Sequence, residues 1–119
     1  MHSVGVDIID IDRIERALER WGQRFQNRIY TPAELAYCRG RLPELAARFA
    51  AKEAVSKALG TGLKGVAWRE IEILADRRGK PHVNLKGRAD RRARELGLSC
   101  FSVSLSHTPS VAVAFVVAE

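Results

Sequence analysis

The sequence is poor in cysteine and in aromatic residues, and it contains no long apolar run. Only two cysteines, Cys38 and Cys100, occur in 119 residues, and neither belongs to a CxxC pair. We therefore predict two free thiols in a reducing compartment, with a single structural disulfide as the alternative. No apolar segment is long enough to cross a bilayer, and residues 1–5 lack the basic and apolar regions of a signal peptide. These features predict a cytoplasmic protein that does not insert into membranes.

Several common catalytic motifs are also missing. The sequence contains no GxSxG nucleophile elbow, no GxxxxGK[ST] phosphate loop and no HExxH metal motif. It has no cluster of cysteine and histidine that would suit zinc. A serine hydrolase of the nucleophile-elbow type, a P-loop nucleotidase and a zinc protease are therefore not expected.

The composition is that of one globular domain over residues 1–119, with 46% hydrophobic and 29% charged residues. The formal net charge of +6 favours an acidic partner, which could be nucleic acid, a membrane surface, an acidic protein or a phosphate ligand. The positive charge is the only feature that favours a nucleic-acid partner. The interleaved exposed aromatics and known motifs of nucleic-acid-binding proteins are lacking. We therefore do not expect a nucleic-acid partner.

The residue pattern predicts an α+β domain built on a mostly antiparallel sheet, with a long central helix. Thr31 and Glu34 form a capping-box signature at the start of one helix. Asp10 and Asp12 suit capping of the helix that follows the first strand. The expected strands are 3–9, 68–74, 82–85, 101–106 and 111–117, and the expected helices are 11–25, 32–39, 43–60 and 87–97.

The long helix carries small apolar residues on one side and polar residues on the other. The polar side comprises Lys52, Glu53, Ser56, Lys57 and Gly60. One interpretation is a solvated face with a Glu53–Lys57 ion pair four residues apart. The other is a polar site, with a carboxylate for a metal and ammonium groups for phosphates. The Gly60-Thr61-Gly62 segment favours the second, because glycines allow backbone to close around an anion.

Other candidate groups come from distant parts of the chain. Asp7 lies among valine and isoleucine, where a buried carboxylate needs a partner. His107 lies in a predicted turn, where a lone histidine is more often simply exposed. Two carboxylates, Asp7 and Glu53, together with lysines suit Mg²⁺, which takes few protein ligands and completes its shell with water and phosphate oxygens. The residues therefore point to phosphate-ester chemistry.

Four arginines in the first predicted helix lie at positions i, i+3, i+7 and i+11. They are Arg13, Arg16, Arg20 and Arg24. If the helix is continuous they form one basic ridge, whose planar guanidinium groups could receive carboxylates or phosphates. A merely solvated face is equally compatible with the pattern.

Taken in order, these motifs resemble the holo-acyl-carrier-protein synthases, the small bacterial 4′-phosphopantetheinyl transferases. The most specific run is RFAAKEA at residues 48–54, followed by Lys57-Ala58 and Gly60-Thr61-Gly62. The others are Gly5-Val6-Asp7 followed by Arg13, then Gly79-Lys80-Pro81, then SLSHT at residues 104–108. The resemblance covers essentially the whole chain.

The resemblance implies transfer of 4′-phosphopantetheine from coenzyme A to a serine of apo-acyl carrier protein, with release of adenosine 3′,5′-bisphosphate, in support of fatty acid biosynthesis. It implies Asp7, Glu53 and Lys57 as catalytic residues, with Asp7 and Glu53 holding Mg²⁺. Either Glu53 or a metal-bound water would take the serine proton. The coenzyme A residues it implies are Arg48, Lys52, Lys57, Gly60, Thr61, Gly62, Pro81, Ser106, His107 and Thr108.

The resemblance also implies partners. It predicts a homotrimer with active sites between subunits, and the apolar strand 111–117 is a candidate for the interface. Acyl carrier proteins are acidic, and their modified serine begins an acidic helix, so we expect the carrier to dock on Arg13, Arg16, Arg20 and Arg24. A non-catalytic protein that only binds coenzyme A is the alternative.

Overall fold

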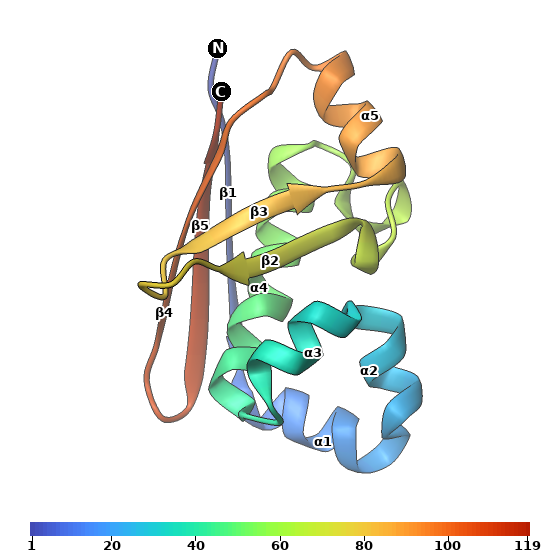
Figure 1. The fold of residues 1–119 in the computed structure, drawn as a ribbon, viewed down its shortest axis with the longest axis vertical. Coiled ribbons are helices and arrows are strands. Elements are labelled where there is room, and N and C mark those ends of the chain that lie inside the picture. The colour runs from blue at the N-terminus through green and yellow to red at the C-terminus, as the bar shows by residue number, and fades with distance from the viewer.

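The computed structural model describes residues 1–119, whose five strands form two antiparallel sheets (Figure 1). The larger sheet has the order β1-β5-β4, with β1 at Ser3–Asp10, β5 at Val111–Ala118 and β4 at Phe101–His107. The smaller sheet is the hairpin of β2 (Ile71–Ala75) and β3 (Pro81–Leu85). The predicted α+β fold and its antiparallel pairing are confirmed.

Helix α4 (Leu42–Ala58) lies between these sheets and packs against β1, β5 and β2. The remaining helices are α1 (Ile11–Trp21), α2 (Gln23–Ile29), α3 (Pro32–Cys38) and α5 (Gly87–Glu95), with short 3-10 turns η1 at Gly62–Lys64 and η2 at Trp68–Glu70. In Figure 1, α1, α2 and α3 gather at one end of α4, and α5 lies at the other. None of these helices has both the length and the apolar character that a membrane span requires.

Two predicted elements are wrong in their boundaries. The helix expected over 11–25 ends at Trp21, because Gly22 has a φ of 54°, a left-handed conformation that glycine adopts at little cost. The strand expected over 68–74 begins only at Ile71, since residues 68–70 form η2. Asp10 occupies the N-cap of α1 without a side-chain capping bond. By contrast, the capping box of Thr31 and Glu34 is present, and both cysteines are free.

Helix α4 is buried on most sides, so its predicted polar face is wrong in part, although Lys57 and Gly60 are exposed. Lys52 and Ser56, assigned to the polar face, are both buried. Strand β1 approaches the helix so closely that a Cβ on Gly5 would overlap the Ala54 carbonyl oxygen. This crossing therefore requires glycine at position 5 of β1.

An ion pair buried from solvent joins α4 to its surroundings. The Lys52 Nζ lies 2.8 Å from Glu34 Oε1 and donates to the carbonyl oxygens of Trp68 at 3.1 Å and Ile71 at 2.5 Å. Glu34 Oε2 accepts from the Ile73 amide at 2.7 Å. The pair thus fixes α3, α4, η2 and β2 against one another.

Candidate active site

Asp7, Glu53 and Lys57 meet where β1 crosses α4. The Lys57 ammonium lies 3.2 Å from Asp7 Oδ1 and donates to the Val6 carbonyl oxygen at 3.0 Å. Half of the Lys57 side chain stays exposed, at 51%, whereas Asp7 is largely covered at 18%. The partner that the carboxylate in the first strand requires is therefore Lys57.

The electrostatics of this group favour an additional cation. Burial raises the pKa of Glu53 above its ordinary value, and the nearby charge of Asp7 raises it further, although Lys57 and Arg13 act in the opposite direction. The two carboxylates therefore repel each other and are only partly neutralised. A divalent cation between them would relieve this repulsion.

The donor set at this position fits Mg²⁺. No group of three or more histidine, cysteine, aspartate or glutamate residues that could hold a metal occurs in the structure. Magnesium needs only one or two protein carboxylates, because water and phosphate oxygens complete its octahedron. Asp7 and Glu53 supply two such carboxylates.

Beside Lys57 is a hollow of about 250 Å³ that reaches from the end of α4 to α5. Lys57 and Gly60 line it, together with Arg92 of α5. Gly60 and Gly62 have positive φ values of 74° and 58°, which fits the predicted role of this segment as a tight loop. Thr61 turns its hydroxyl to the Gly62 carbonyl oxygen and lines a separate hollow formed with arginines of α5. Arg92 was not among the residues predicted from the sequence.

Four other predicted residues, Arg48, Pro81, Ser106 and His107, line a different hollow of about 180 Å³. The Arg48 guanidinium is held there by the Ile73 carbonyl oxygen at 3.2 Å and by Glu44 Oε2 at 3.0 Å. Arg48 therefore faces the β2 side of α4, whereas Lys57 faces β1. The predicted coenzyme A residues form two separate groups within one chain.

Two predicted residues are fully engaged within the fold. The ammonium of Lys52 is buried in its bonds to Glu34, Trp68 and Ile71, so it has no access to a phosphate in this structure. Thr108 Oγ1 accepts from the amides of Ser110 at 3.3 Å and Val111 at 3.1 Å, which closes the turn between β4 and β5. Lys52 therefore supports the fold here, and only Thr108 stays at the surface.

The predicted arginine ridge is interrupted. Arg13, Arg16 and Arg20 lie exposed on α1, but the break at Gly22 places Arg24 on α2, so one continuous ridge of four is wrong.

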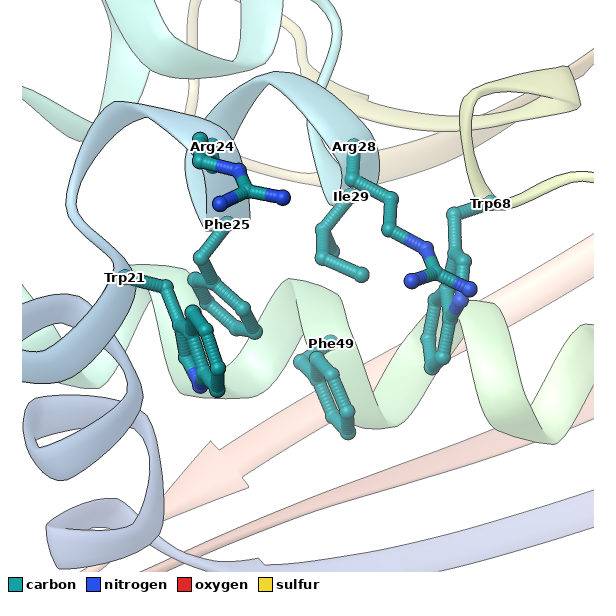
Figure 2. Close-up of a pocket in the computed structure, with 7 residues that line it drawn as sticks. All are labelled: Trp21, Arg24, Phe25, Arg28, Ile29, Phe49 and Trp68. Atoms are coloured by element: carbon teal, nitrogen blue, oxygen red, sulfur yellow. The ribbon is translucent and has the colours of Figure 1, made fainter.

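Arg24 instead lies at an apolar hollow of about 450 Å³ (Figure 2). Figure 2 shows the guanidinium groups of Arg24 and Arg28 beside a set of aromatic rings. Phe49 of α4 packs there against Trp68 with ring centroids 4.6 Å apart. The full lining is Trp21, Arg24, Phe25, Arg28, Ile29, Phe49 and Trp68.

Comparison with known proteins identifies relatives of the whole chain. The family model of the 4′-phosphopantetheinyl transferase superfamily matches residues 3–116. A holo-[acyl-carrier-protein] synthase of Herpetosiphon aurantiacus is 57% identical, with 98% of each chain covered. The crystal structure of the synthase from Neisseria meningitidis is 42% identical, with a TM-score of 0.90 over 98% of this chain and 97% of that one. The Helicobacter pylori synthase, in complex with coenzyme A, is 32% identical, with a TM-score of 0.89 over 98% of this chain and 99% of that one.

The raised pKa of Glu53 makes a prediction about stability. The pKa of Glu53 is higher in the folded chain than in the unfolded chain. The free energy of unfolding therefore falls as pH rises from the pKa of the unfolded chain to that of the folded chain, because Glu53 ionises more readily when the chain is unfolded. We expect Glu53→Gln to raise the melting temperature in metal-free buffer at neutral pH. The gain should vanish below the ordinary carboxyl range, where the wild-type side chain is protonated as well. Glu19→Gln, on the exposed face of α1, serves as the control, and a lower melting temperature for Glu53→Gln at neutral pH would contradict the assignment.

Proposed function

The chain belongs to the holo-[acyl-carrier-protein] synthases of the 4′-phosphopantetheinyl transferase superfamily, and we propose that Asp7, Glu53 and Lys57 form its reaction centre. The reaction moves 4′-phosphopantetheine from coenzyme A to a serine of apo-acyl carrier protein. The observation that carries the assignment of the centre is the meeting of two mutually repelling carboxylates with a half-exposed lysine. A cytoplasmic location stays the expectation from the sequence.

Each residue of the centre has a distinct task. Asp7 and Glu53 would hold Mg²⁺, which when bound supplies positive charge to the pyrophosphate and to the departing adenosine 3′,5′-bisphosphate. The Lys57 ammonium, oriented by the Val6 carbonyl oxygen, would neutralise a phosphate oxygen. Glu53 is also a candidate for the group that accepts the serine proton, because its carboxylate belongs to this centre.

This centre can be tested by incubating apo-carrier protein with the enzyme, coenzyme A and Mg²⁺. A gel shift then measures how much holo-carrier protein has formed. Asp7→Asn and Glu53→Gln should each lower the rate by about a hundredfold or more, because each removes an anionic ligand of the cation that stabilises the departing group. Asp10→Asn, an exposed change on the same strand, is the matched control.

A chelator should abolish wild-type activity, and added Mg²⁺ should restore it. Full activity in excess chelator would refute the magnesium assignment. Binding of coenzyme A without any holo-carrier product would instead favour the non-catalytic alternative.

The two groups of coenzyme A residues support active sites shared between subunits. Lys57 faces β1 and Arg48 faces β2, so one chain presents two half-sites on opposite sides of α4. We propose that Arg48, Pro81, Ser106 and His107 of one subunit complete the site formed by Asp7, Glu53 and Lys57 of its neighbour.

The uncovered face of the larger sheet is our candidate for the interface of a homotrimer. Val4, Val6, Ile8 and Phe115 are all at least 48% exposed, and Val6 pairs with Phe115 in the β1–β5 register. Figure 1 shows helices on only one side of this sheet. Burying such apolar side chains against another copy would stabilise an oligomer.

This assembly can be tested with Phe115→Lys, which places a charge at the centre of the apolar face. We expect light scattering to give a trimer for the wild type and smaller species for the variant, with transfer activity lost in parallel. Ser99→Lys, in an exposed loop, controls for the added charge. A wild-type monomer with full activity would contradict the shared site.

The exposed arginines of α1 and the apolar hollow next to them suit a carrier protein. Acidic groups of the carrier helix would face Arg13, Arg16 and Arg20, while an apolar carrier side chain enters the hollow beside Arg24 and Arg28. Arg13 is close enough to lower the pKa of Glu53, so a carrier held there places its serine near the centre. Charges at such a rim mainly raise the association rate.

We expect Arg13→Glu and Arg20→Glu to raise the KM for carrier protein and to leave the KM for coenzyme A nearly unchanged. Activity should also fall as salt rises through roughly 0.15 M, where the screening length is about 8 Å. Arg94→Glu, on α5, is the charge-matched control. Weaker coenzyme A binding with an unchanged KM for the carrier would assign these arginines to the phosphate site instead.

A further inference from the structure

The side chain of Arg92 reaches from α5 to the end of α4. Its Nε donates to the Leu59 carbonyl oxygen at 3.1 Å. Its Nη2 lies 3.7 Å from the point where a Cβ on Gly60 would stand. This anchor orients the guanidinium beside the glycine loop that follows α4.

Arg92 also opens into the hollow that Lys57 and Gly60 line. Two of the other arginines of α5 are neutralised, since Arg88 pairs with Glu70 and Arg94 with Asp90. No carboxylate oxygen lies within 4.0 Å of the Arg92 guanidinium nitrogens. The hollow therefore contains two cationic groups, of which Lys57 is half exposed and Arg92 half buried.

We propose that Arg92 is a further phosphate-binding residue of the coenzyme A site, acting in the hollow that Lys57 also lines. The proposal rests on the function proposed above. One guanidinium N–H is used by Leu59, and the other four are available to an anion. A guanidinium presents parallel donors that match the oxygens of a phosphate group.

A purely structural role makes a different prediction. The bond to Leu59 satisfies a carbonyl at the C-terminal end of α4, where a cation also complements the helix dipole. If that were the whole role, loss of the guanidinium would lower stability and leave ligand affinity intact.

Coenzyme A offers phosphate chemistry at two places, the diphosphate and the 3′-phosphate. The test is calorimetric titration of the wild type, Arg92→Gln and Arg92→Lys with coenzyme A and with dephospho-coenzyme A. We expect Arg92→Gln to weaken coenzyme A binding about tenfold, the loss of one charge-assisted hydrogen bond. Arg92→Lys should recover part of the affinity. Arg69→Gln, which removes the same charge at an exposed position of η2 that lines none of these hollows, should bind like the wild type.

The second ligand identifies the phosphate that Arg92 contacts. Weakening with both ligands assigns Arg92 to the diphosphate, and weakening with coenzyme A alone assigns it to the 3′-phosphate. In the transfer assay the change should appear in the KM for coenzyme A rather than in kcat.

Unchanged affinity for both ligands, with only a lower melting temperature, would overturn the proposal and leave Arg92 as a helix cap. Equal weakening by Arg69→Gln would overturn it as well, because the effect would then be one of net charge. Calorimetry also separates this inference from the proposed function. If the wild type binds coenzyme A but makes no holo-carrier, the transfer function fails while the effect of Arg92→Gln is still measured.

Discussion

The ion pair between Lys52 and Glu34 is the constraint on which the rest of the structure depends. Both side chains are 0% exposed, and both are completed by backbone groups of η2 and β2. Removing one partner of such a pair costs about 3–5 kcal/mol, because the other charge stays buried without compensation. The pair therefore permits one register of α4 against its neighbours, and that register sets where Glu53 and Lys57 emerge.

The same register places the two half-sites on one rigid element. Lys57 is fixed to β1 through the Val6 carbonyl oxygen, and Arg48 is fixed to β2 through the Ile73 carbonyl oxygen. Because a single helix carries both, neither half-site can shift without the other. A composite site between subunits would then inherit its geometry from α4 and from the apolar sheet face, with no mobile loop needed to align it.

The sequence predicted most of the fold because its signals are local. The capping box at Thr31, the hairpins and the extent of α4 follow from neighbouring residues. Two predictions failed for different reasons. The first helix was predicted too long, because Gly22 fits the amphipathic period and yet breaks the helix. Lys52 was placed on a polar face, because a helical wheel does not reveal that α3 supplies a buried carboxylate to it. For the site, motif resemblance brought Asp7 and Glu53 together, whereas no local signal links Arg92 to Leu59 across 33 residues.

Adjacent residues of α4 illustrate how a fold separates support from function. The ammonium of Lys52 is hydrogen-bonded within the protein to a carboxylate and two carbonyl oxygens, although burial still lowers its pKa. Glu53 is compensated only in part, because burial and Asp7 together outweigh the favourable charges of Lys57 and Arg13. A charged group that already has its hydrogen-bond partners within the protein gains little free energy from a ligand. A charged group that is buried beside a like charge gains much more. The rigid pair at Lys52 thus holds in place the carboxylates whose mutual repulsion a bound cation would relieve.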